Sequence, residues 1–196
     1  SKSIIIKEFG ILSEKICVIP EGSYIEYYNK IDSKSVDFQK TNFTCLYLGQ
    51  IKGYKGIDDL IKVAKDCQFD DIHFIIAGLI MEPDLMWLEK EAKSFQNITF
   101  HNKFIRESEL SSYYRIADVV VLPFKAILNS GSVIMAMGFA KPIIAPAIGV
   151  VKHRLMQQKE LLYTDGNLES AIKFARSLSA DELTEIGRRN YGVVAE

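Results

Sequence analysis

Two glycine-containing segments of the sequence carry residue types that bind phosphate groups. The first, Gly49–Gly56, has three glycines, which let the backbone approach a ligand closely, and its lysines Lys52 and Lys55 bring positive charge. The second, Asn129–Ser132, leads directly into an apolar helical stretch. Unpaired N–H groups at a helix start attract anions, here with two hydroxyls beside them. Both segments therefore predict an anion site, although Ser130 could equally cap a helix without any ligand.

Better-known nucleotide-binding motifs do not fit this sequence. It has no GxxxxGK[ST], which excludes a P-loop, and the glycines of Gly49–Gly56 do not follow GxGxxG. The second expected strand ends at Ala77-Gly78, without the acidic residue that holds the ribose of a dinucleotide. NAD binding is therefore disfavoured. The scattered histidines His73, His101 and His153 predict no zinc site, and we expect no bound metal.

Short apolar segments alternate with amphipathic ones along the chain, which predicts strands alternating with helices. The expected strands are Phe43–Leu48, Ile72–Ala77, Ile98–Phe100, Val119–Leu122, Ile143–Ala145 and Leu161–Tyr163. Apolar residues at helical spacing lie between them, at 57–64, 85–95, 110–117 and 168–178. Ser179 and Glu182 match a capping box that begins a last helix at Ala180–Tyr191.

This alternation predicts an α/β fold, a doubly wound parallel sheet of Rossmann-like type with helices on both faces. The loops that follow the strands then share one edge of the sheet, where ligands bind in such folds. Residues 29–42 are polar and weakly periodic and predict a linker. Residues 1–22 predict a helix, a short strand at Ile16–Ile19 and a turn, which together would cross over from an N-terminal domain; the main domain would span residues 23–196.

Composition places the chain among soluble globular domains. Apolar residues make up 48% and charged residues 25%, and the net charge of −1 at pH 7 gives no general attraction to nucleic acid or to an anionic membrane. The cysteines Cys17, Cys45 and Cys67 are odd in number and lie in or beside apolar segments. They predict core thiols in a reducing cytoplasm and no disulfide framework.

Six short motifs, in order, resemble those of the C-terminal, nucleotide-sugar-binding domain of retaining GT-B glycosyltransferases of family 4, the group 1 type. The residues that carry the resemblance are Lys15–Gly22, Leu48-Gly49 with Tyr54–Gly56, Ile75–Gly78, Ile98–Phe104 with Glu109-Leu110, Ala117–Pro123, and Ala136–Ala145. The resemblance runs from about Lys7 to about Tyr191.

The resemblance implies that a nucleoside-diphosphate sugar, such as a UDP- or GDP-sugar, binds along the loop edge of the sheet. Lys55 would bind the donor pyrophosphate in the loop that also contains Gly49 and Gln50. Backbone N–H groups at Ser130, Gly131 and Ser132 would receive a donor phosphate. The backbone around Phe104 and Ile105 would meet the base. No metal or other cofactor is implied, because cationic side chains and a helix start can balance the charge of the leaving group.

The sequence also departs from the family pattern. The two carboxylates of the family's E-x7-E motif would fall at Ile127 and Met135, and the family's arginine is replaced by Gln50. The first change removes the usual partner of the ribose hydroxyls and the acid beside the sugar. Asn129 and the neighbouring serines would supply some of these contacts, which makes Asn129, with Lys55, a candidate catalytic residue.

We therefore expect a hexosyltransferase that transfers a sugar with retention to a glycan or lipid-linked acceptor, in surface polysaccharide or glycolipid synthesis. The acceptor would bind the N-terminal domain, so the chain alone should be inactive. That domain could also bring peripheral association with the inner face of the membrane. No nucleic-acid partner is expected. The missing carboxylates leave open a degenerate subunit or nucleotide-binding scaffold. A receiver-like signalling domain is disfavoured, because no acidic cluster ends the first strand.

Overall fold

The computed structural model covers most of the 196-residue chain. It describes residues 2–17, 22, 25–28, 31, 42–66, 71–127, 130–164 and 166–195. The expected linker at 29–42 lies almost wholly outside these residues, and so does Cys67.

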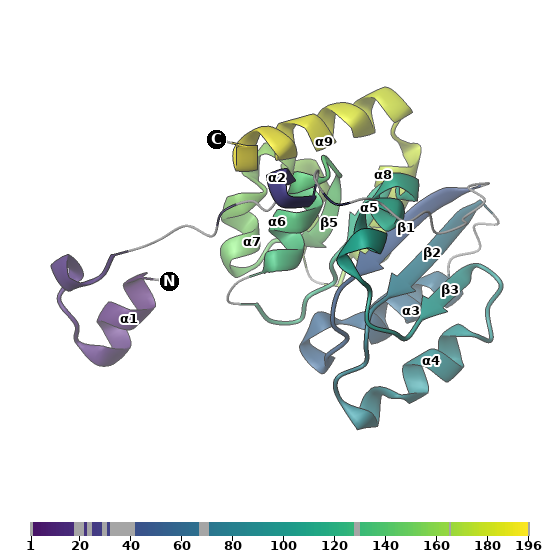
Figure 1. Ribbon diagram of the computed structural model, residues 1–196, viewed down its shortest axis with the longest axis horizontal. Coiled ribbons are helices and arrows are strands. Elements are labelled where there is room, and N and C mark those ends of the chain that lie inside the picture. Colours follow the sequence, from purple (N-terminus) through teal and green to yellow (C-terminus); the bar gives the residue numbers. More distant parts are fainter. Residues whose placement is uncertain are drawn as a thin grey trace.

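A parallel sheet forms the centre of the domain (Figure 1). Its strands are β1 (Phe43–Leu48), β2 (Ile72–Ala77), β3 (Ile98–His101), β4 (Val119–Val121), β5 (Ile143–Pro146) and β6 (Leu162–Tyr163). They lie in the order β3-β2-β1-β4-β5-β6, and each neighbouring pair is parallel. The predicted fold class is confirmed, and all six strands predicted between Phe43 and Tyr163 are present, with ends that differ by one residue at most. The central strands are apolar throughout because helices cover both of their faces.

Helices cover the two faces of the sheet in separate groups (Figure 1). On one face α3 (Ile57–Asp66) packs beside α4 (Trp87–Ala92) and α8 (Leu168–Ser177). On the other lie α5 (Glu107–Ile116) and α6 (Gly131–Gly138), with α9 (Ala180–Ala195) packed on α6. The short helix α2 (Ile25–Tyr28) lies against α5, and α7 (Gly149–Arg154) follows β5.

The helical spacing of apolar residues predicts three of these helices well and one only in part. In α3 the predicted stripe Ile57, Leu60, Ile61 and Ala64 is fully buried. The capping box of α9 is formed: Ser179 Oγ accepts from the N–H of Glu182, and the Glu182 carboxylate accepts from the N–H of Ser179. This helix continues past Tyr191 to Ala195.

The stripe expected at 85–95 is instead divided. Pro83–Leu85 form a 3₁₀ turn, and α4 begins only at Trp87 and ends at Ala92. Phe95 therefore lies beyond the helix, in a turn, yet still packs on the core. The apolar spacing of this segment shows only which residues are buried. Both a continuous helix and a 3₁₀ turn followed by a shorter helix bury them.

The N-terminal helix α1 (Lys2–Phe9) is followed by a 3₁₀ turn at Ser13–Lys15, and both lie away from the sheet in Figure 1. Of the strand expected at Ile16–Ile19, only Ile16 and Cys17 are described, and neither belongs to a strand. Cys17 is exposed, so its prediction as a core thiol was wrong, because the apolar residues around it have no core to join here. Cys45 is buried in β1, as predicted.

Candidate functional site

The order of the sheet identifies one place where two loops diverge. Strands β1 and β4 are neighbours, but the chain leaves β1 for α3 on one face and leaves β4 for α6 on the other. At such a switch point the loops separate and leave a crevice beyond the carboxyl ends of the strands. The first loop is the segment 49–56 that the sequence predicts to bind phosphate, and the described residues after β4 lead at Ser130 into the second predicted segment and the start of α6.

Direct contacts hold these two loops together. The N–H of Lys125 donates to the carbonyl of Tyr54 at 2.9 Å. Gly56 has a left-handed φ of 71°, and a Cβ atom there would lie 1.9 Å from the carbonyl oxygen of Pro123. A Cβ atom at Gly49 would lie 3.2 Å from Ser132 Oγ. Gly56 is therefore required by the close approach of the second loop, and Gly49 lies close to the start of α6.

Lys55 ends the 3₁₀ turn Gly53–Lys55 and is 9% exposed. Its ammonium nitrogen lies 4.6 Å from the centre of the Phe124 ring and 5.3 Å from that of Tyr54. Burial, and to a smaller extent the charge of Lys52, lowers the pKa of Lys55 below its ordinary value. Within the described residues no carboxylate pairs with it. A lysine so placed has given up hydration without gaining a counter-ion, which makes it ready to receive an anion.

The start of α6 supplies the other half of the site. Ser130 is the N-cap, and its hydroxyl oxygen accepts from the N–H of Val133 at 3.3 Å. The capping interpretation of Ser130 is thus realised. In the part of the chain that the structure describes, the N–H groups of Gly131 and Ser132 have no acceptor. The capped helix still presents two free amides and the positive end of its dipole.

The other predicted site residues are distributed along the same edge of the sheet. Phe104 is 74% exposed and Ile105 half-buried, and both follow β3, two strands from β1. Two strand spacings are about 10 Å, which suits the distance from a pyrophosphate to a base. Gln50 is exposed, and its backbone carbonyl accepts a hydrogen bond from the hydroxyl of Tyr47 at 2.7 Å. Asn129 lies outside the described residues.

The positions of the two missing carboxylates contain apolar side chains in the structure as well. Ile127 and Met135 are both partly buried and pack against the core. Neither can accept hydrogen bonds from a ribose. The roles predicted for Lys55 and Asn129 in catalysis remain predictions.

Sequence reasoning missed the two aromatic rings around Lys55. Tyr54 was noted only as part of a motif, and Phe124 was not considered. Phe124 is 3% exposed and closes one side of the lysine. Phe124 comes three residues after the end of β4. This position could have marked it as a site residue, because residues just beyond a strand end face the switch-point crevice.

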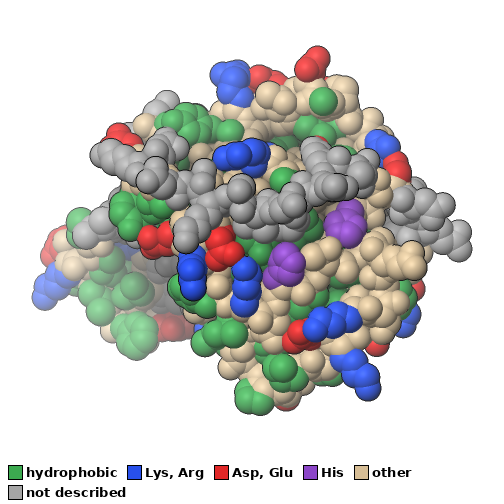
Figure 2. Space-filling model, turned by 45° about the vertical axis from the view of Figure 1, so that its right-hand side comes forward, with side chains coloured by type: hydrophobic (Ala, Val, Ile, Leu, Met, Phe, Trp, Pro, Cys, Tyr) green, Lys and Arg blue, Asp and Glu red, His purple; other side chains and the backbone are tan. Residues whose placement is uncertain are grey.

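Figure 2 shows acidic and basic side chains interspersed with apolar ones on the face that it presents. Among the described residues no three His, Cys, Asp or Glu side chains are grouped so that they could hold a metal ion. No helix in the described ranges is long and apolar enough to cross a bilayer.

Comparisons with known proteins agree with this architecture. Among solved structures, sucrose-phosphate synthase from Thermosynechococcus elongatus matches with a TM-score of 0.74 at 20% identity, over 99% of this chain and 51% of that one. A UDP-forming trehalose-phosphate synthase from Burkholderia xenovorans matches with a TM-score of 0.70 at 12% identity, over 89% and 47%. The chain therefore spans about half the length of these structures, and at such identities the likeness concerns the fold.

Sequence comparison gives a family. A GDP-mannose:glycolipid 4-beta-D-mannosyltransferase from Xanthomonas campestris pv. campestris is 30% identical over 102 residues, which are 52% of this chain and 29% of that protein. The family model described as "Glycosyl transferases group 1" matches residues 29–191, most of the chain and the whole sheet. By that match, and in agreement with its fold, this chain belongs to the group 1 glycosyl transferases.

Proposed function

We propose that the crevice between β1 and β4 binds the diphosphate of a nucleotide sugar. The observation that supports this most directly is Lys55, a cation with little exposure and no carboxylate partner among the described residues. The free amides of Gly131 and Ser132 begin a helix whose second residue stands 3.2 Å from the Cβ position of Gly49, in the loop that carries Lys55. Two independent sources of positive potential thus serve one anion.

In this proposal the chain stabilises the leaving nucleotide. When the bond between the sugar and the diphosphate breaks, negative charge develops on the phosphate oxygen. Lys55 and the amides that begin α6 are already in place to bind that charge, so little reorganisation is needed as it forms. No metal ion is required for this step.

The substrates belong to the proposal too. We infer that the donor is a UDP- or GDP-sugar and that the acceptor is a glycan or a lipid-linked sugar. The Xanthomonas relative, named for transfer from GDP-mannose to a glycolipid, makes a GDP-sugar and a glycolipid the first pair to test.

Calorimetry with UDP, GDP, ADP and their sugars tests the donor site. We expect one of these nucleotides to bind more tightly than millimolar and inorganic sulfate to bind far more weakly. If none of the panel binds, the donor site is wrong, whatever the family of the chain.

Retention at the anomeric carbon is the stereochemical outcome that the family resemblance implies. NMR of the transferred product tests this, because the one-bond C1–H1 coupling of the new anomeric centre distinguishes α from β, also for a mannosyl group. A β-linked product from an α-linked donor would contradict retention. The β-D-mannosyl group in the name of the Xanthomonas relative makes this alternative worth testing first.

The apolar side chains at Ile127 and Met135 favour one second candidate, a scaffold that binds nucleotide without transfer. Transfer of radiolabelled sugar by the full-length gene product distinguishes the two. Incorporation that Lys55→Ala abolishes excludes the scaffold, whereas nucleotide binding without any incorporation supports it.

A further inference from the structure

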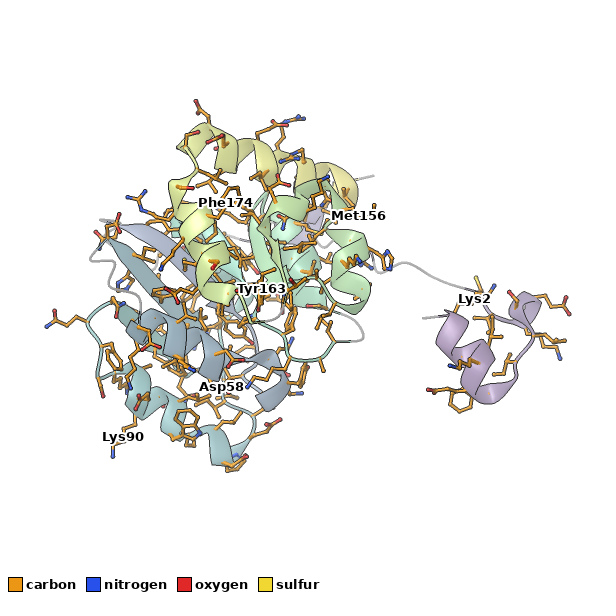
Figure 3. All side chains as sticks on the ribbon, turned by 180° about the vertical axis from the view of Figure 1, so that it is seen from behind. Lys2, Asp58, Lys90, Met156, Tyr163 and Phe174 are labelled. Atoms are coloured by element: carbon orange, nitrogen blue, oxygen red, sulfur yellow. The ribbon has the colours of Figure 1, made fainter. Side chains whose placement is uncertain are left out.

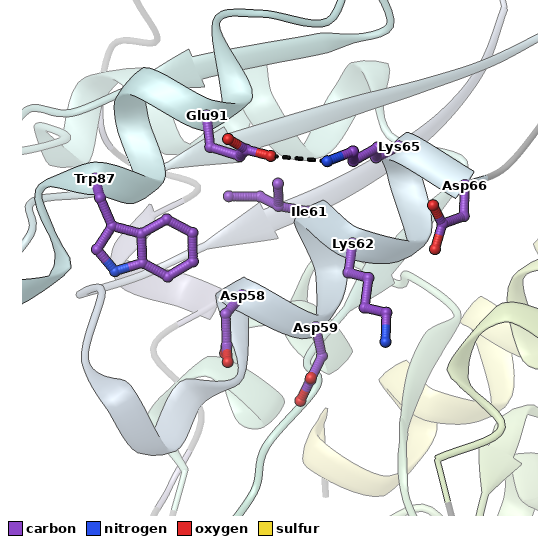
Figure 4. A pocket seen from close by; sticks show the side chains of 8 residues that line it. All are labelled: Asp58, Asp59, Ile61, Lys62, Lys65, Asp66, Trp87 and Glu91. Atoms are coloured by element: carbon purple, nitrogen blue, oxygen red, sulfur yellow. Dashed lines mark hydrogen bonds and ion pairs between the residues drawn. The ribbon is translucent and has the colours of Figure 1, made fainter.

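A second surface, along helix α3, has the chemistry of a carbohydrate-binding groove. It lies between α3 and α4, has a volume of about 440 Å³, and has the indole of Trp87 at one side (Figure 4). Trp87 is 52% exposed at the start of α4, although the neighbouring Leu88 is buried. An indole left in water at the wall of a groove is a ready surface for the apolar face of a sugar ring.

The groove continues across α3 toward the carboxyl edge of the sheet. A second cavity of about 710 Å³ lies between α3, the start of α8 and the ends of β4 to β6. Asp59, Lys62 and Asp66 line both, so the two cavities form one surface that follows α3. Tyr163 lies at its far end, near enough to Asp59 that this carboxylate helps raise the tyrosine's pKa. We call this surface the α3 groove.

Acidic side chains outnumber basic ones in the α3 groove, whose two cavities are lined by Asp58, Asp59, Asp66, Glu91 and Glu169 and by Lys62, Lys65 and Lys125. Asp58 pairs with Lys125, and Glu91 pairs with Lys65 at 3.1 Å. Lys62 and Asp66 have no partner within the described ranges, and Asp59 lies 3.5 Å from Lys125. This excess of negative charge disfavours a nucleotide or another polyanion here. Carboxylate and ammonium groups beside an aromatic ring suit neutral hydroxyl groups, which both donate and accept hydrogen bonds.

We propose that the α3 groove binds a neutral oligosaccharide, with one pyranose ring on the indole of Trp87 and its hydroxyls on Asp59, Lys62 and Asp66. Binding of this kind would keep a glycan acceptor or product near the enzyme between transfers. The Trp87 end of the groove shares no lining residue with the donor crevice, whereas the far end reaches Phe124, which lies beside Lys55. The proposal rests on family membership only in that sugars are the substrates of glycosyl transferases.

Trp87 is the one tryptophan of the sequence, so its fluorescence reports directly on the groove. The probes are mannotetraose, cellotetraose and maltotetraose. We expect one of them to shift the emission to the blue and to reduce quenching by acrylamide. An unchanged spectrum with all three, in protein that still binds nucleotide, would overturn the groove and leave the donor site standing.

Variants then test the residues. Trp87→Ala and Lys62→Ala should each weaken binding of the tetrasaccharide, measured by saturation-transfer NMR, about tenfold or more for the tryptophan. The control is Phe174→Ala, since Phe174 is a similarly exposed aromatic on α8 that does not line the groove (Figure 3). Circular dichroism verifies that each variant folds. If Trp87→Ala does not fold, the loss of tetrasaccharide binding in Lys62→Ala tests the groove. Equal losses in Phe174→Ala, or a fluorescence response only to a lysine-rich peptide, would contradict the proposal.

Discussion

Gly49 lies so close to the start of α6 that a Cβ atom at this position would stand 3.2 Å from the hydroxyl oxygen of Ser132. The two residues belong to different loops, and each loop carries one of the positive elements of the site. Their proximity brings the loop that carries Lys55 against the start of α6, and the predictions below test whether the lysine and the helix amides bind one ligand.

Removal of the Lys55 ammonium should weaken nucleotide binding. A hydrogen bond to a charged group contributes about 1.5–3 kcal/mol, so Lys55→Ala should lower the affinity for UDP or GDP about tenfold or more by calorimetry. Lys90→Ala, at an exposed position on α4 remote from the crevice (Figure 3), is the matched control. An affinity that is the same in both variants would remove Lys55 from the site.

Nucleotide affinity should depend on pH through Lys55. Burial lowers the pKa of this lysine below 10.5 in the free protein, and a bound diphosphate favours its charged form. Affinity should therefore be constant at neutral pH and fall as pH rises through the lowered pKa, earlier than for an ordinary lysine. Calorimetry between about pH 7 and pH 10 checks this, and Lys55→Arg should remove the decline because arginine stays charged. A decline that persists in Lys55→Arg would assign it to another group.

Lys55 should make the stability of the free protein rise with pH, whereas it makes nucleotide affinity fall. The unfolded chain holds the Lys55 proton more tightly than the folded chain does, so the free energy of unfolding should rise as pH increases between the lowered pKa and 10.5. Urea denaturation of the native protein and of Lys55→Met at several alkaline pH values measures the difference. A slope of unfolding free energy against pH that is less positive in the native protein than in Lys55→Met would contradict the assigned direction of the pKa.

Gly56 should not tolerate a side chain. Its φ of 71° strains any other residue, and a Cβ atom would overlap the carbonyl of Pro123 at 1.9 Å. Gly166 has a similar φ of 76°, but no atom lies within 4 Å of a Cβ placed there. Gly166→Ala should therefore lower the free energy of unfolding only by the backbone strain, about 1–2 kcal/mol. Gly56→Ala should cost more by urea denaturation and should also weaken nucleotide binding. Equal costs for both would mean that the loops are not in close contact.

Helix α9 contains a second matched pair of glycines. A Cβ atom at Gly187 would lie 2.0 Å from the carbonyl oxygen of Ala140, where α9 packs on the end of α6, whereas Gly192 has no neighbour within 4 Å. Gly187→Ala should therefore destabilise the domain by about 1–3 kcal/mol. Gly192→Ala should leave it unchanged or stabilise it by up to about 1 kcal/mol, because alanine favours a helix. Thermal unfolding of both variants checks the sign, and destabilisation by Gly192→Ala alone would contradict this packing.

The sequence by itself determined the elements of this fold and the loops to examine. Continuous apolar runs such as Phe43–Leu48 predict strands buried on both faces, and the stripe from Ile57 to Ala64 predicts one side of a helix. The glycines of the first loop and Ser130 before an apolar helix are local signals too. Motif order sufficed for the family, because it depends on residue types and not on contacts.

Tertiary structure alone decided which of these loops share a site. No pattern along the chain shows that β1 and β4 are neighbours, that Phe124 closes over Lys55, or that Pro123 requires a glycine at Gly56. Such contacts depend on strand order and close packing between segments far apart in sequence. For the same reason the stripe at 85–95 could not reveal that Trp87 stands half exposed beside a groove, since periodicity records which residues are buried together but not what lies beyond them.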